Sequence, residues 1–153
     1  MRKQCRRKIW STQTNPVAHA IAGAAITTRD VLDRLRFREL AALEAVTKGH
    51  GNVNDWQILC DLLNVAEMMG KQGVGPEVLP VCKEVHDALH KAALRYEKTQ
   101  KIGLDGKGIQ AIRELMEYAD LQQSSISRSE FERYIQKTHD YIRSGGHDVL
   151  EIS

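Results

Sequence analysis

The sequence predicts an all-α protein, folded as a single compact bundle of five or six helices. Apolar residues recur at helical spacing along most of the 153 residues, Gly-rich turns separate these stretches, and no stretch alternates apolar and polar residues as a convincing strand would. Apolar residues make up 42% of the chain and aromatic residues only 5%, a balance that suits helix packing. With no internal repeat and no long linker, we expect one helical domain over residues 15–146, preceded by a basic stub (1–14) and followed by a short tail (147–153).

The first two helices are predicted from their ends. Asn15 and Pro16 are suited to the N-cap and first position of a short helix that ends near Ala25. Thr28 or Asp30 can then cap a longer helix that stops at Gly49. The apolar positions that track one face of this longer helix are Val31, Leu32, Leu35, Leu40, Leu43 and Val46.

The middle of the chain predicts three more helices. The loop GHGNVN supplies Gly for positive φ and Asn for the next cap. The stretch DWQILCDLLNVAEMMG is apolar on more than one side, which predicts a helix at the centre of the bundle. A long helix is expected from Pro76 to about Lys101, and another from about Ile109 to Gln123.

The last helix is predicted to open with a capping box formed by Ser127 and Glu130. It ends at the turn SGG. The residues it is expected to turn inward are Phe131, Tyr134, Ile135 and Ile142.

Positive charge is concentrated at the start of the chain. The net charge is +2, and because five basic residues lie in the stub, the rest of the chain is slightly negative. The residues of the stub that could hold phosphates by charge are Arg2, Lys3, Arg6, Arg7 and Lys8. Arg34 and Arg38 share a helix face and could extend this patch. A solvated face balanced by Asp30, Asp33 and Glu39, with Arg36 on the opposite side, is the favoured interpretation.

Cysteine use indicates a protein of the reducing cytosol. The chain has three cysteines, an odd number, at the widely spaced positions Cys5, Cys60 and Cys82. No CxxC pair is present, which argues against disulfides and structural zinc. No stretch approaches the roughly 20 apolar residues of a membrane span, so no membrane partner is expected. The polar STQTN between the basic start and the small-residue run PVAHAIAGAA does not fit a secretory signal.

The stretch CKEVHDALH places Cys82, His86 and His90 at four-residue steps. Each step advances about 40° around a helix, so the row should spiral from the core edge into solvent instead of converging on a metal. A thiolate activated by His86 is sterically possible but has no oxyanion site beside it. We therefore predict a free cysteine and two surface histidines, with no metal, cofactor or catalytic residue.

Several stretches together resemble a family of small uncharacterised all-helical proteins encoded by tailed phages and prophages. They are the basic start, NPVAHAIAGA, EAVTKGHG, DWQILCDLLNVAEMMGKQGVG and ELMEYADLQQSSISRSEFERYIQ. The basic start departs from the family's usual pattern because it lacks a Pro. The resemblance implies a phage-related accessory protein that acts inside a bacterial cell.

These observations lead to three functional hypotheses. The first is a non-enzymatic accessory factor that binds a host or phage protein, for example to inhibit an anti-phage defence such as CRISPR interference. The second is a nucleic-acid-binding accessory protein that uses the basic stub, with Arg34 and Arg38. The third is an enzyme or metalloprotein built on Cys82, His86 and His90. A homodimer is compatible with all three.

Overall fold

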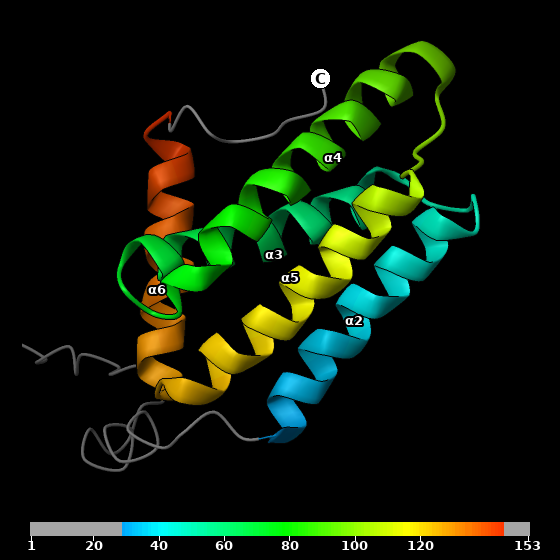
Figure 1. Ribbon diagram of the computed structural model, residues 1–153. Helices are drawn as coiled ribbons and strands as arrows, with labels where there is room; N and C mark the ends of the chain where they lie inside the picture. The colour runs from blue at the N-terminus through cyan, green and yellow to red at the C-terminus, as the bar shows by residue number, and fades with distance from the viewer. Residues whose placement is uncertain (1–28, 146–153) are drawn as a thin grey trace, which may run out of the picture.

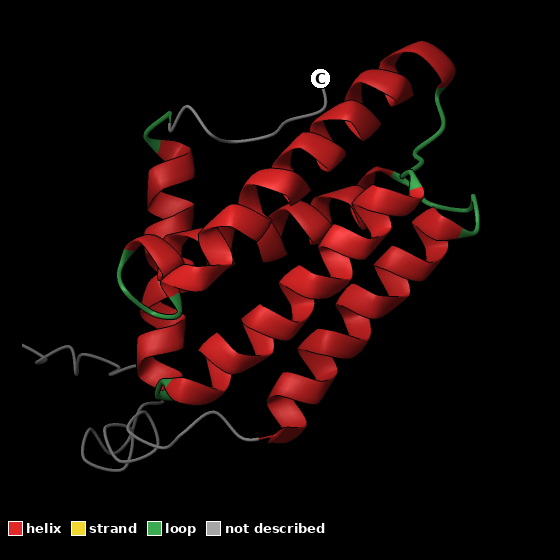
Figure 2. Ribbon diagram, in the orientation of Figure 1, coloured by secondary structure: helices red, strands yellow, loops and turns green. Residues whose placement is uncertain are grey.

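A computed structural model of the chain describes residues 29–145, which form five α-helices and one 3₁₀ turn with no strand among them (Figures 1 and 2). This confirms the predicted all-α bundle. The elements are α2 (Arg29–Thr47), α3 (Val53–Lys71), η1 (Pro76–Val78), α4 (Leu79–Thr99), α5 (Gly106–Ser125) and α6 (Arg128–Arg143). The short helix predicted to end near Ala25 lies outside the described residues.

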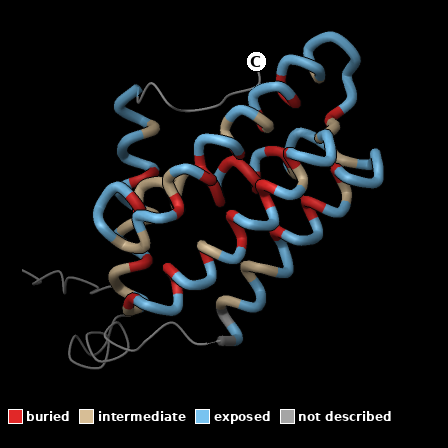
Figure 3. Tube along the Cα trace, in the orientation of Figure 1, coloured by how far each residue is buried: buried red, intermediate tan, exposed pale blue. Residues whose placement is uncertain are grey.

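Helix α3 is the centre of the bundle, as its apolar pattern predicted. It packs against α2, α4, α5, α6 and η1. Trp56 is fully buried, and its indole Nε1 donates to the carbonyl oxygen of Leu89 on α4 at 3.0 Å, which satisfies the one polar atom of the ring. Burial is concentrated on the sides of the helices that face α3 (Figure 3).

Two hydrophobic clusters hold the helices together. The larger one joins α2, α3, α4 and α5. The smaller one consists of Met69, Ile126 and Phe131, with half-buried neighbours from α2, α3 and α6. Helix α6 therefore attaches mainly to α3, through a core of its own. No helix within residues 29–145 combines the length and apolar character needed to cross a bilayer.

Two predicted helix starts are corrected. The helix expected from Pro76 begins as the 3₁₀ turn η1, and α4 starts at Leu79. Gly70 of α3 allows this turn to pack closely, because a Cβ there would lie 2.7 Å from Val78 Cγ1. At α6, Ser127 Oγ accepts from the Glu130 backbone N–H at 3.2 Å, but the return bond of the predicted capping box is absent from the described residues.

Two residues of α2 lie elsewhere than predicted. Leu40, expected on the core face, is 47% exposed, and Glu39, expected on a solvated face, is only 9% exposed. The apolar spacing of Leu32, Leu35 and Leu43 places the core direction between them, about 100° away from Leu40. Glu39 falls inside that core sector and needs a charged partner there.

Candidate functional site

The structure describes two of the predicted phosphate-binding residues, Arg34 and Arg38. Arg2, Lys3, Arg6, Arg7 and Lys8 lie outside the described residues. Arg34 and Arg38 are both exposed on α2, one turn apart, and neither makes an ion pair with another described residue. Arg36, between them in sequence, points to a different side of the helix, as predicted.

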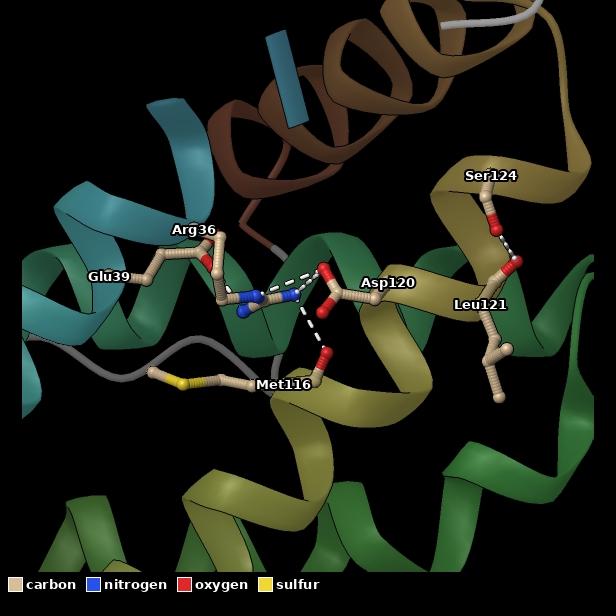
Figure 4. Close-up of polar contacts among 6 residues, drawn as sticks. All are labelled: Arg36, Glu39, Met116, Asp120, Leu121 and Ser124. Atoms are coloured by element: carbon tan, nitrogen blue, oxygen red, sulfur yellow. Dashed lines mark hydrogen bonds and ion pairs between the residues drawn. The ribbon is translucent and has the colours of Figure 1, made fainter. Parts of the chain in front are cut away.

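Arg36 links α2 to α5 (Figure 4). Its Nε donates to Asp120 Oδ1 at 3.0 Å, and its Nη2 donates to the Met116 carbonyl oxygen at 2.7 Å. Its Nη1 donates to Glu39 Oε2 on the same helix. A guanidinium presents donors in several directions at once, which is why one side chain can bind two carboxylates and a carbonyl. The register between α2 and α5 is therefore fixed at this level.

Glu39 is the most strongly perturbed carboxyl group at this junction. Burial raises its pKa from 4.5 to about 7, although the Arg36 charge opposes the shift. Asp120 adds to the upward shift, because two carboxylates share one guanidinium. Glu39 Oε1 makes no hydrogen bond with any described residue.

Three large apolar side chains are exposed beside this junction. Phe37 is 76% exposed and Leu121 is 68% exposed. Leu40 adds to them on α2, one turn from Phe37. In Figure 4, Leu121 points away from the Arg36–Asp120 ion pair. We call Phe37, Leu40 and Leu121 the outer α2–α5 face.

Helix geometry turns Phe37 and Leu121 toward the same side of the bundle, with Leu40 one turn from Phe37. Helices α2 and α5 both pack on α3, so side chains opposite their core faces point away from α3 on the same outer side of the bundle. The Arg36–Asp120 ion pair sets the next residues along, Phe37 and Leu121, at the same level of the two helices. Phe37 and Leu121, 84 residues apart in the sequence, are therefore both exposed at this level of the bundle.

A cavity of about 320 Å³ lies on the other side of α2, between α2, α3 and α6. We call it the α2–α6 cavity. Its apolar wall is formed by Leu35, Ile58, Leu62, Val65, Phe131 and Ile135. Its polar lining consists of Arg38, Glu39, Asp61, Gln123 and His139.

The Cys82, His86 and His90 row progresses from core to solvent, as predicted. Cys82 is fully buried, deeper than the core edge expected, while His86 is half-buried and His90 exposed. The two imidazole rings stack with centroids 6.4 Å apart. Burial raises the pKa of Cys82 to about 12, so the reactive thiolate is scarce at neutral pH. Within residues 29–145, no three His, Cys, Asp or Glu side chains are grouped to hold a metal ion.

Sequence reasoning missed the outer α2–α5 face and the α2–α6 cavity. A signal for the first was present, because Phe37 falls opposite the apolar stripe of its own helix. Gln123 gave no such signal, since a glutamine among polar residues near a helix end reads as a surface residue.

The fold and these surfaces define a small all-helical bundle protein. No protein-family model, curated protein or solved structure matches the chain.

Proposed function

We propose that this protein acts without catalysis, by binding another protein through the outer α2–α5 face. The observation that carries the proposal is the exposure of Phe37 and Leu121 at one level of two adjacent helices. Single exposed leucines are ordinary on protein surfaces, but a large aromatic side chain grouped with two leucines is a feature of contact surfaces. Burying a side chain of this size contributes roughly 1.5–3 kcal/mol, enough to anchor an interface.

The charges around the face favour a protein partner. Arg34 is exposed on the outward side of α2, Glu44 is paired with Lys48 at 2.6 Å, and half of Asp120 remains accessible. Such a mixture of signs would repel as many phosphates as it attracts. A partner with an apolar strip, such as one side of an amphipathic helix, fits this chemistry.

The biological setting stays a prediction. The resemblance to proteins of tailed phages and prophages suggests a host or phage protein as the partner, in the cytoplasm of the bacterial cell. Inhibition of an anti-phage defence such as CRISPR interference is one form that this binding would take.

The proposal is tested by comparing affinity capture from nuclease-treated bacterial lysate for three forms of the protein. Phe37→Ser should lose a specific protein partner that the wild type retains, because it removes the central apolar anchor. Leu94→Ser is the matched control: Leu94 is an exposed leucine on α4, and α5 lies between α4 and α2 (Figure 1). Equal capture by all three forms, or no specific protein at all, would contradict the proposal.

Nucleic-acid binding is the second candidate, and one observation favours it. Arg34 and Arg38 keep their guanidinium groups exposed and without an ion pair among the described residues, so both are available to phosphates. Replacing both by Gln should weaken binding to duplex DNA and reduce its salt dependence. Binding that is unchanged by this double substitution would remove these two residues from the hypothesis.

A further inference from the structure

The α2–α6 cavity contains a buried polar side chain without a partner. Gln123 of α5 is only 4% exposed, yet its carboxamide makes no hydrogen bond with any other described residue. The amide oxygen and nitrogen of Gln123 are not sealed from solvent, so their hydrogen-bond partners must be groups that enter the cavity. A group bound in the cavity would supply what Gln123 lacks.

The neighbouring glutamine differs in what its amide nitrogen contacts. Gln122 is equally buried, but its Nε2 donates to the carbonyl oxygens of Ala66 at 3.1 Å and Val74 at 2.8 Å. Gln122 therefore joins α5 to α3 and the loop after it. Gln123 lines the cavity and has no such structural role.

A second polar atom lies open at the same cavity. Glu39 Oε2 accepts a hydrogen bond from Arg36, while Oε1 has no hydrogen bond from the described residues. The cavity thus offers a carboxyl oxygen as acceptor and a carboxamide as both donor and acceptor. The rest of its wall is mainly aliphatic and aromatic.

The charges at the cavity are already balanced. Glu39 has Arg36 as its counterion, and the exposed residues of the lining carry opposite charges, Arg38 against Asp61. An ionic ligand would find no net countercharge in the lining and would lose its hydration on entering. An uncharged molecule has no such cost.

We propose that the α2–α6 cavity binds a small uncharged molecule with an apolar ring or chain and one hydroxyl group. The hydroxyl can donate to a carboxylate oxygen and accept from an amide N–H, which are the groups that Glu39 and Gln123 present. The volume of about 320 Å³ lies at the lower end of the range for small-molecule sites, so the ligand is about the size of a substituted phenol. This site is separate from the outer α2–α5 face and does not depend on it.

The test is titration of the full chain with three probes of similar size: p-cresol, toluene and 4-methylbenzoate. Backbone amide chemical shifts report both affinity and location. We expect saturable shifts from p-cresol in residues of α2, α3 and α6 around the cavity, weaker binding of toluene, and the weakest binding of the anion. Absence of saturable p-cresol binding, shifts located elsewhere, or tightest binding of 4-methylbenzoate would overturn the proposal.

Two substitutions identify the polar contact. Gln123→Leu replaces the amide with an apolar side chain of similar size. It should weaken p-cresol binding about three- to tenfold and leave toluene binding unchanged. Gln110→Leu, at an exposed glutamine of the same helix, is the control and should alter neither probe. Circular dichroism verifies that both variants are folded. An unchanged preference for p-cresol over toluene in Gln123→Leu would overturn the role of the hydroxyl.

Discussion

At the scale of single residues, Gln122 and Gln123 show that two equally buried side chains can differ in their hydrogen bonds to the protein. Both side chains are buried, at 2% and 4% exposure. Gln122 Nε2 satisfies two carbonyl oxygens, although its own Oε1 has no partner among the described residues. Its stabilising effect therefore comes from the donor side of the amide.

We predict that Gln122→Met destabilises the protein by about 1–2 kcal/mol, because the Val74 carbonyl oxygen loses its side-chain donor. Gln123→Met, one residue further along, should be nearly neutral, because the Gln123 amide makes no hydrogen bond with any described residue and is not sealed from solvent. Urea unfolding of the two variants measures the difference. Equal losses would show that size, and not hydrogen bonding, governs both positions.

Glu39 makes stability depend on pH. Its folded-state pKa of about 7 lies above its ordinary value of 4.5, so the folded protein favours the protonated form. Its contribution to stability is complete below pH 4.5 and is lost as the pH rises through 7. The groups that set this pKa, besides burial, are Arg36, Asp120 and Arg38.

We predict that this residue lowers the free energy of unfolding by on the order of 3 kcal/mol between about pH 4 and pH 8. Glu39→Gln cannot ionise, so its stability should lack this decline. The quantity to measure is the difference between wild-type and variant unfolding free energies at each pH, which cancels the titration of other groups. Parallel pH curves for the two proteins would contradict the account.

At the scale of helices, the start of α3 is the best-defined end. Asn52 Oδ1 accepts from the Asp55 N–H at 2.9 Å, and the Asp55 carboxylate accepts from the Asn52 N–H at 3.0 Å. This reciprocal capping box satisfies two backbone N–H groups that the helix leaves unpaired.

We predict that Asn52→Ala costs about 1 kcal/mol of stability, because one capping bond is lost at the central helix. Asn54→Ala is the matched control, since Asn54 is exposed and its side chain makes no hydrogen bond with any described residue. Thermal unfolding of both variants tests the prediction. A similar loss in the control would assign the effect to the asparagine-to-alanine change itself.

The sequence predicts helices better than it predicts how they pack. The apolar periodicity gave α2, α3, α4 and α5 to within a few residues, because period and caps are local properties. The predicted sides for Glu39 and Leu40 were wrong, because a shift of one helix position moves a side chain by about 100° around the axis. The Arg36–Asp120 ion pair spans 84 residues and has no local signature.

At the scale of the whole molecule, α2 contributes to two separate surfaces. One side, with Phe37 and Leu40, belongs to the outer α2–α5 face, and the other lines the α2–α6 cavity. Arg36 and Glu39 lie between them, and Arg36 connects α2 to α5. A substitution at Arg36 or Glu39 can therefore alter both the outer α2–α5 face and the α2–α6 cavity.

The most direct test of the central claim is affinity capture from nuclease-treated bacterial lysate with three forms: the full chain, a chain lacking residues 1–8, and full-length Phe37→Ser. We expect the first two forms to capture the same specific protein and Phe37→Ser to lose it, because binding belongs to the helical body. In parallel lysate without nuclease, recovery of nucleic acid alone, abolished by removing residues 1–8, would contradict the claim. The basic stub would then be the functional element.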